Sequence, residues 1–268
     1  MYRFIFCFLF LFLHSSAWAA VAIDQSGATD NGAAQAGTVT HSFTCANSNT
    51  LLLVGVSIRE TTTTVTTLTD LTYNGLAIAD ATLVTSFTTP TSGTRIVTVY
   101  LYYFKPGAAC NGSANNLVAS LSVDKLAVLG ALSLTGVDQT TPVDGAITTH
   151  SAGTPTDPAP CGSVTTETGD LVLCAIALRN SGVTVSAINN GTQTWQDVTT
   201  DNTPASDDVR GLGATTTGTG GQVIEYNLST TAEWATAAVN INASVASTKK
   251  RQSPIYYNLL DTLLRRLS

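Results

Sequence analysis

The sequence has few charged side chains, and basic ones are the scarcest, which narrows the range of partners. Charged residues make up only 11% of the 268 positions. Between residues 20 and 248 there are seventeen acidic side chains and six basic ones, namely Arg59, Arg95, Lys105, Lys125, Arg179 and Arg210. Binding to nucleic acid phosphates depends on clustered lysine and arginine. So acidic a body excludes DNA and RNA as partners.

Motifs of catalysis and of transition-metal binding are also missing. The chain has three histidines, and neither His41 nor His150 lies near a G-x-S-x-G elbow or within an H-x-x-x-H pattern. A Ser–His–Asp site needs a nucleophile in a strained turn with a base in reach, so we interpret both histidines as ordinary surface residues. Glutamates, which could pair in a jelly-roll glycoside hydrolase, are scarce. We therefore predict that the protein is not an enzyme, and a carbohydrate-active enzyme is the least favoured alternative.

No apolar run is long enough to cross a membrane. The longest, residues 4–13 (FIFCFLFLFL), has ten residues, whereas a spanning helix needs about 20. Arg3 precedes it, and Ala17 and Ala19 follow it at the spacing of a cleavage site. This pattern is typical of a secretory signal peptide. We expect residues 1–19 to be removed and the remainder to be secreted or exposed at the cell surface. A retained N-terminal anchor is the alternative.

Four cysteines remain beyond residue 19, and an even number in an exported chain indicates two disulfides. A hairpin turn near Glu167 and Thr168 would set Cys161 opposite Cys174, which leaves Cys45 to pair with Cys110. Free buried thiols are the alternative. No C-x-x-C motif is present, so zinc and thioredoxin-like redox sites are excluded.

The body is rich in strand and turn signals. Residues 50–58 and 170–178 are near-continuous apolar runs, as expected of central buried strands, and Asn-Gly pairs mark tight turns. No interior segment sustains a helical period. We predict an all-β fold, a two-sheet antiparallel β-sandwich of the jelly-roll or immunoglobulin-like kind. It would span residues 20–248, with a candidate sub-boundary in the Pro/Gly-rich residues 150–160.

Three segments recur in order along the chain, which indicates two related parts. The first set reads LLLVGVSI, LTYNGLAIADAT and LAVLGALSLTGV, and the second DLVLCAIAL, SAINNGTQTWQDVT and EWATAAVNINA. Each set gives a buried strand, an Asn-Gly hairpin and a closing strand. Two such halves suit a sandwich in which each half supplies strands to both sheets. Coincidence among similar β strands is the alternative.

Residues 249–268 differ in composition from the body, with five basic side chains and one acidic. Ser253 fits an N-cap, Pro254 a first helical position, and the leucines fall on one face. We predict a short basic amphipathic helix, too short to span a bilayer. Docking on protein, contact with an anionic membrane surface and a non-functional extension remain open.

Two features near residue 195 are candidates for ligand binding. Trp195 follows an Asn-Gly turn, and its ring could stack on a sugar, although core packing is the favoured interpretation. The adjoining acidic loop carries Asp201, Asp207 and Asp208, oxygen ligands of the kind that calcium prefers. The spacing is not that of an EF-hand, and a solvated acidic loop is the alternative. Calcium is the only cofactor we consider.

The segments NTLLLVGVSI, LTYNGLAI, ALSLTGVDQTTPVD, TETGDLVL and EWATAAVNI follow an order that resembles bacterial exported β-sandwich modules of cell-surface and extracellular proteins. The most distinctive piece is GVDQTTP at residues 136–142, and the resemblance covers residues 21–246. It implies the fold and the location. Such modules often stand beside adhesive or carbohydrate-associated domains and have no known catalytic motif. The cysteines and the basic tail depart from the pattern.

Together these observations favour a secreted or surface-exposed, non-catalytic β-sandwich module. We expect adhesive or carbohydrate-associated binding, with a glycan or a cell-surface protein as partner. The alternative is a structural subunit of an extracellular fibre or coat, in which strand edges pair between copies.

Overall fold

The two apolar runs of the sequence form the strands β4 (Leu51–Glu60) and β12 (Leu171–Arg179), and every residue of both is buried. Successive side chains of a strand point to opposite faces. In β4, Leu51 and Leu53 enter one hydrophobic cluster while Leu52 and Val54 enter another. A strand needs apolar residues at every position when sheets pack on both of its sides. The molecule is layered accordingly.

The computed structural model describes residues 18–32, 36–46, 50–60, 65–89, 96–151, 156–200, 208–221 and 223–245. Within the chain, Ala19–Ser244 forms one unit, and that unit is described below. Nearly all of its regular structure is β, and the paired strands are antiparallel. The predicted all-β class is confirmed.

The first half of the unit, β2 to β9, forms two sheets. The five-stranded sheet has the order β2 (Ala22–Asp30), β9 (Ala127–Thr135), β4, β7 (Ile96–Phe104) and β6 (Ala81–Thr88). The three-stranded sheet has the order β3 (Ala36–Thr44), β8 (Ala114–Lys125) and β5 (Leu68–Tyr73). Two short 3-10 helices, η1 (Ile78–Asp80) and η2 (Gly107–Ala109), lie in the connections.

The second half, β10 to β17, is built the same way. Its five-stranded sheet has the order β10 (Val143–His150), β17 (Trp234–Ile241), β12, β15 (Val209–Thr217) and β14 (Thr192–Val198). Its three-stranded sheet has the order β11 (Ala159–Pro160), β16 (Glu225–Leu228) and β13 (Val185–Asn189). The short strands β1 (Trp18–Ala19) and β18 (Ser244–Val245) pair with each other.

The strand order of the second half repeats that of the first with every number raised by eight. The recurring segments of the sequence therefore do correspond to a recurring topology. The arrangement differs from the predicted two sheets with strands shared between halves, because each half forms its own five-stranded and three-stranded pair. The pairing of the central strands shows the separation of the halves. Among the described strands, β4 pairs with β7 and β9 of the first half, and β12 pairs with β15 and β17 of the second.

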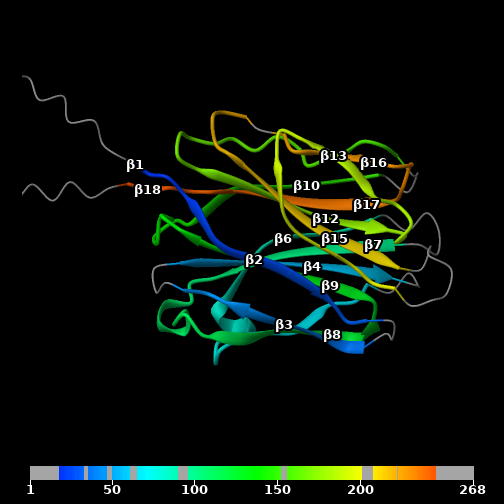
Figure 1. Ribbon diagram of the computed structural model, residues 1–268, viewed down its shortest axis with the longest axis horizontal. Coiled ribbons are helices and arrows are strands. Elements are labelled where there is room, and N and C mark those ends of the chain that lie inside the picture. Colours follow the sequence, from blue (N-terminus) through cyan, green and yellow to red (C-terminus); the bar gives the residue numbers. More distant parts are fainter. Residues whose placement is uncertain are drawn as a thin grey trace, which may run out of the picture. The chain divides into compact units, whose positions relative to one another are not determined.

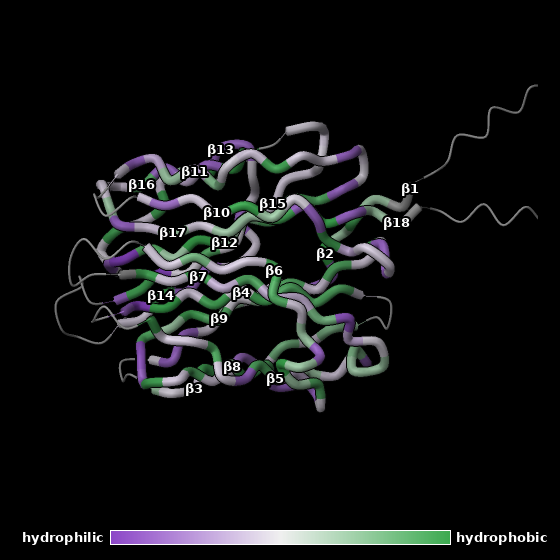
Figure 2. The backbone as a smooth tube through the Cα atoms, turned by 180° about the vertical axis from the view of Figure 1, so that it is seen from behind, coloured by the Kyte–Doolittle hydropathy of each residue, from purple (hydrophilic) through white to green (hydrophobic). Residues whose placement is uncertain are grey.

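Three hydrophobic clusters separate the four layers (Figure 1). One lies between the two five-stranded sheets, and the other two lie between each five-stranded sheet and its three-stranded partner. Figure 2 shows the hydrophobic residues along β4, β9 and β12, the strands enclosed by these clusters. The fold is thus β-sandwich-like in each half.

The two five-stranded sheets pack face to face, and each edge strand of one sheet lies beside an edge strand of the other. Strand β2 packs against β14 at one margin, and β6 packs against β10 at the other. Under the eight-strand repeat, β2 corresponds to β10 and β6 to β14, so the two margins are equivalent places in the two halves. A groove lies at each of these margins.

Two predictions concern residues that the structure leaves undescribed. The signal peptide at residues 1–19 lies almost wholly outside the described residues, and the basic helix at residues 249–268 lies entirely outside them. In the part of the chain that is described, no helix has the length and apolar character needed to cross a membrane.

Candidate functional site

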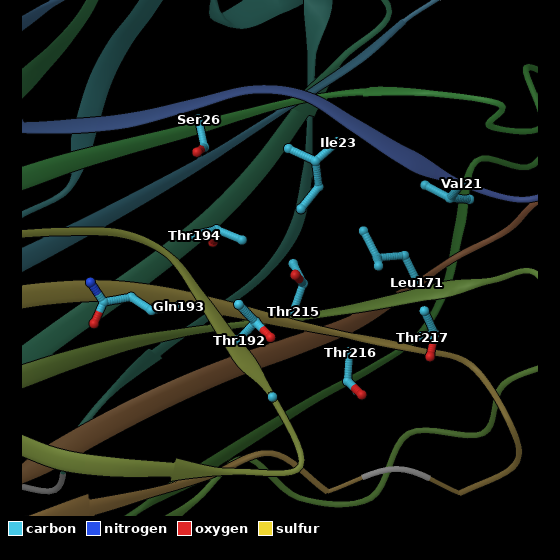
Figure 3. A pocket seen from close by; sticks show the side chains of 11 residues that line it. Val21, Ile23, Ser26, Leu171, Thr192, Gln193, Thr194, Thr215, Thr216 and Thr217 are labelled. Carbon is cyan, nitrogen blue, oxygen red and sulfur yellow. The ribbon is translucent and has the colours of Figure 1, made fainter.

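A groove of about 540 Å³ lies at the margin where β2 meets β14 and β15. Figure 3 shows side chains from β2 facing side chains from β14 and β15 across this space. Its polar lining consists of Ser26, Thr192, Gln193, Thr194, Thr215, Thr216 and Thr217. Its aliphatic lining consists of Val21, Ile23 and Leu171.

Edge strands and bulges place these side chains. The pairing of β2 with β9 shifts between Ile23 and Gln25, and that of β14 with β15 shifts between Gln193 and Trp195. A bulge bends its strand and redirects the neighbouring side chains. As a result Ile23 is 43% exposed at the groove, while Thr194 donates a hydrogen bond from its hydroxyl to the carbonyl oxygen of Gly213 at 3.0 Å.

The chemistry of the groove is neutral and rich in hydroxyls. Each serine or threonine hydroxyl both donates and accepts hydrogen bonds, and the glutamine amide does the same through separate atoms. The aliphatic residues supply apolar contact beside them. A groove with many polar handles and no ionisable lining residue fits a neutral ligand with many hydroxyl groups better than a charged one.

A cluster of charged residues lies further along the same two strands. Asp30 ends β2, and its carboxyl group lies within hydrogen-bonding reach of Asp197 on β14. Burial, together with the nearby charge of Asp197, raises the pKa of Asp30. The imidazole of His41 lies against Gly27, where a Cβ atom would stand 2.8 Å from Nε2, and burial lowers the pKa of His41.

Arg210 supplies a cationic group near this cluster but uses its donors elsewhere. Its Nε donates to the carbonyl oxygen of Val183 and its Nη2 to that of Ser181, both at 2.9 Å. The charged cluster thus joins strands of the two halves through close carboxyl groups. The hydroxyl-lined groove lies along the same two strands.

Trp195 is not the exposed sugar-binding platform that the sequence suggested as one option. Its side chain is 4% exposed and belongs to the cluster between the five-stranded sheets. Gly130, Gly213 and Gly55 border the indole, and a methyl group at Gly130 or Gly213 would overlap it. The bulge at Gln193 turns the ring inward, so core packing is the correct interpretation.

The acidic loop proposed for calcium is only partly described. Asp201 and Asp207 lie outside the described residues. Asp208 is 3% exposed and accepts a hydrogen bond from the Thr199 hydroxyl at 3.5 Å. Across the described ranges, His, Cys, Asp and Glu side chains form no group of three that could hold a metal ion.

Both predicted disulfides are present, Cys45 with Cys110 and Cys161 with Cys174. The reason given for the second pair was wrong. Cys161 follows β11 and Cys174 lies within β12, and these strands belong to different sheets rather than to one hairpin. The turn near Glu167 does exist, since the Asp170 amide donates to the Glu167 carbonyl oxygen at 3.2 Å. The bridge therefore ties one layer to the next.

Other candidate catalytic groups have structural partners. His150 stacks on Phe87 with ring centroids 4.4 Å apart, and Glu233 forms an ion pair with Arg179 at 2.9 Å. Glu60 accepts hydrogen bonds from the backbone and the hydroxyl of Thr66, both at 2.7 Å. These contacts account for the positions of the side chains without a substrate.

Sequence reasoning missed the groove itself. Its residues come from segments near positions 21–26, 171, 191–194 and 215–217, which are far apart in the chain. The only local signal was the density of threonine in NGTQTW and GATTTG, which is expected of any exposed strand. Comparison of the chain with protein-family models, with curated proteins and with solved structures finds no match.

Proposed function

We propose that this chain is an exported, non-catalytic β-sandwich module that binds a glycan segment in the groove between β2 and β14. The observation that supports this best is the lining, in which seven hydroxyl or amide side chains stand beside three aliphatic ones. A carbohydrate presents hydroxyl groups that pair with such donors and acceptors, and its apolar faces contact aliphatic groups.

Independent features support the proposed location. Two disulfides are expected of a protein that folds in an oxidising compartment. Residues 1–19 have the pattern of a secretory signal peptide, and the acidic body is poorly suited to nucleic acid. We therefore place the protein outside the cell or on its surface. In this proposal residues 249–268 form a short amphipathic helix that docks on protein or on an anionic membrane surface.

A binding screen tests the groove. The exported chain is screened against cellohexaose, xylohexaose, mannohexaose and chitohexaose, and the variants Thr192→Val and Gln193→Ala are compared with it. Each variant removes a hydrogen-bonding group at the groove, so we expect affinity to fall about three- to tenfold per group. Thr40→Val, at an exposed position of β3, is the matched control and should bind normally. Binding by none of the four sugars, or full binding by both groove variants, would contradict the proposal.

The open edges of the sheets favour a second candidate, a subunit of an extracellular fibre or coat. Strands β2, β6, β10 and β14 each end a five-stranded sheet and so carry backbone groups without a strand partner. Such edges can pair with another chain. Size-exclusion chromatography and negative-stain imaging separate the candidates, because a monomer that stays monomeric on concentration argues against the fibre.

A further inference from the structure

Four oxygen-bearing side chains meet at one end of the five-stranded sheet of the second half. Asp144 lies at the start of β10, and Asp170 directly precedes β12. Asn240 and Asn242 lie at the end of β17, the strand between those two. The pairing sets Asn240 opposite both Asp144 and Val172, and residues directly opposite share a face of the sheet. Val172 belongs to the cluster beneath the three-stranded sheet, so the four side chains gather on that face.

The side-chain amide of Asn240 lies among the oxygens of the other three residues. Its Nδ2 stands 2.9 Å from Asp144 Oδ1, 2.9 Å from Asp170 Oδ2 and 2.8 Å from Asn242 Oδ1. A side-chain amide nitrogen carries two hydrogens, so it cannot donate fully to three acceptors. Three oxygens, two of them from carboxylates, therefore converge on a point that has too few donors for them.

The oxygen of the same amide is an independent sign of a ligand. Asn240 is 1% exposed, and its Oδ1 has no hydrogen-bond partner in the described part of the chain. A buried acceptor without a partner is costly, and a bound ion is one of the standard explanations for such an atom. A half-turn of the amide about χ2 exchanges its nitrogen and oxygen. That half-turn places the unpartnered oxygen among the other three, where a cation compensates for all four.

The two carboxylates have no basic side chain of their own half beside them. The segment from β10 to β17 contains two basic residues, Arg179 and Arg210. Arg179 is the last residue of β12, at the far end from Asp170, and Arg210 lies at that same far end on the neighbouring strand. Lys105 of the first half directs its ammonium group to the carbonyl oxygen of Gln139 at 2.8 Å. The negative charge at this end of the sheet thus favours a cation from solution.

We propose that Asp144, Asp170, Asn240 and Asn242 form a calcium site at the end of β10, β12 and β17. Calcium takes roughly six to eight oxygen ligands from carboxylates, amide oxygens and water, in flexible geometry. The two carboxylates and the two amide oxygens supply the protein ligands, and the exposed position of Asp144 lets water complete the shell. Magnesium is less suited, because it demands a near-ideal octahedron. Zinc is less suited because it prefers nitrogen and sulfur ligands.

The backbone holds two of the proposed ligands in place. Asp170 accepts hydrogen bonds from the amides of Glu167 and Ala243, both at 2.8 Å. Asn242 donates from Nδ2 to the carbonyl oxygen of Thr141 at 2.7 Å, so its nitrogen is engaged outside the cluster and its oxygen is left for the ion. Fixed ligands lower the ordering cost of binding. The calcium ion would connect three strands, and the site does not depend on sugar binding at the groove between β2 and β14.

Calorimetry and NMR test the site together. The chelator-treated exported chain is titrated with calcium chloride and, separately, with magnesium chloride. We expect saturable calcium binding with a Kd of about 0.1–1 mM, as in other extracellular modules, and magnesium binding at least about tenfold weaker. In the ¹⁵N spectrum calcium should shift the amides of residues 144–145, 170–171 and 240–243.

Variants assign the ligands. Asp144→Asn removes a charged ligand and should weaken calcium binding at least about tenfold, and Asn242→Ala about three- to tenfold. Asp124→Asn, at an exposed position of β8, changes the net charge equally and should leave calcium affinity unchanged.

Three outcomes would overturn the site. One is calcium shifts confined to residues 196–200 and 208–210, beside the acidic loop. Another is a titration that does not saturate below about 10 mM, which would indicate only diffuse attraction to an acidic surface. The third is equal calcium affinity in the unaltered chain and in whichever of Asp144→Asn and Asn242→Ala gives the amide spectrum of a folded protein. Asp144 is exposed, so its variant should fold, and Asn242→Ala decides if it does not.

Discussion

The two halves repeat one strand order, yet they fill the contact between their five-stranded sheets with side chains of different size. In the second half Trp195 pairs with Gly213, and its ring lies on Gly55 and Gly130 of the first half. A ring of this volume fits only because the surrounding positions carry no side chain. The second half thus supplies the large side chain, and the first half supplies glycines that leave room for it.

When the two halves are exchanged, the equivalent positions carry side chains of different sizes. Thr85 lies opposite Leu101, and these two positions are equivalent to Trp195 and Gly213. Ala175 lies opposite Ala237, and these two are equivalent to Gly55 and Gly130. The small residue Thr85 therefore has leucine and alanine neighbours at the positions where the large Trp195 has three glycines. Interiors are close-packed, so total volume has to be conserved even where individual residues are not. The comparison shows that one strand order is compatible with two different packing patterns.

The largest effect should come from truncating the ring. Trp195→Ala leaves a cavity among glycines whose backbones cannot move in to fill it, and we expect a loss of about 3–5 kcal/mol in the free energy of unfolding. Denaturant unfolding measures this. Thr85→Ala, the equivalent position of the first half, is the control and should cost about 1 kcal/mol. Comparable losses for the two variants would mean that the margins are not packed differently.

A double-mutant cycle sharpens the same point. In the unaltered chain Gly130→Ala brings a methyl group into the indole, and it should destabilise the fold. In the Trp195→Ala background the methyl enters the vacated space, so its cost should fall or change sign. Strict additivity of the two changes would contradict the proposed contact.

The disulfides differ between halves in the loop that each closes. Cys45–Cys110 spans 65 residues and Cys161–Cys174 spans 13. Closing a longer loop removes more entropy from the unfolded chain, so replacing both cysteines by alanine should cost about 4 kcal/mol in the first half and about 3 kcal/mol in the second. Thermal and denaturant unfolding of the two double variants check the order. A larger loss in the second half would show that native-state contacts outweigh loop entropy.

The comparison of the two halves also shows which features could be predicted from the sequence and which could not. The central strands were predictable, because burial on both faces demands apolar residues at every position, as in β4. Both cysteine pairings were predicted, but the hairpin invoked for Cys161 and Cys174 was wrong, since a chain segment can cross between sheets without a local signal. Trp195 was ambiguous because a single bulge decides whether its ring points inward.

The grooves were beyond prediction for a related reason. No motif marks them, and each forms only where an edge strand of one half meets an edge strand of the other. Which edges meet depends on how two whole sheets pack, a property of many residues at once. Tyr103 reads locally as one more residue of an aromatic strand, and only the packed sheets reveal that it lines a groove.

The buried polar network of the second half should matter more than its counterpart in the first. Asp170 is 4% exposed and accepts three hydrogen bonds, from Glu167, Asn240 and Ala243. Asp170→Ala leaves the backbone amides of Glu167 and Ala243 without their acceptor and removes one of the acceptors of Asn240, so we expect a loss of about 2–3 kcal/mol. Denaturant unfolding measures the loss, and unchanged stability would mean that water replaces the carboxylate.

The first half offers a comparison at the position of Asn240, which donates to Asp170. Register places Ser133 at the position equivalent to Asn240, and its hydroxyl donates to Asp24 Oδ2 at 3.0 Å. Ser133 is fully buried, and its hydroxyl also accepts a hydrogen bond from the Gln25 amide at 3.1 Å. A neutral hydroxyl with one bond to a carboxylate should still matter less than a buried carboxylate with three donors, so Ser133→Ala should cost about 1–2 kcal/mol. A larger loss from Ser133→Ala than from Asp170→Ala would reverse the comparison.

Asp30 should give a smaller effect, visible through pH. Burial, with the nearby carboxylates of Asp197 and Asp208, raises its pKa, while His41 and Arg210 are the basic groups around Asp197. The folded chain then holds the proton more tightly than the unfolded chain does. The contribution of Asp30 to stability is present below the pKa of the unfolded chain and is lost as the pH rises through the pKa of the folded chain. Asp30→Asn should therefore raise Tm near pH 7, by no more than about 2–4 °C, with little change near pH 4.

Asp138 provides a test of opposite sign in the GVDQTTP turn. Backbone amides of Thr140 and Thr141 donate to its Oδ1 at 2.6 and 3.2 Å and lower its pKa. Its contribution is present above the unfolded pKa and is lost as pH falls through the lowered folded value. Asp138→Asn should therefore lower Tm near pH 7, and the difference should shrink toward pH 3. Because the carboxylate is largely solvated, water screens the effect, and we expect the smallest shift here. Shifts of the same sign for Asp30→Asn and Asp138→Asn would show that local hydrogen bonding and burial do not set these two pKa values.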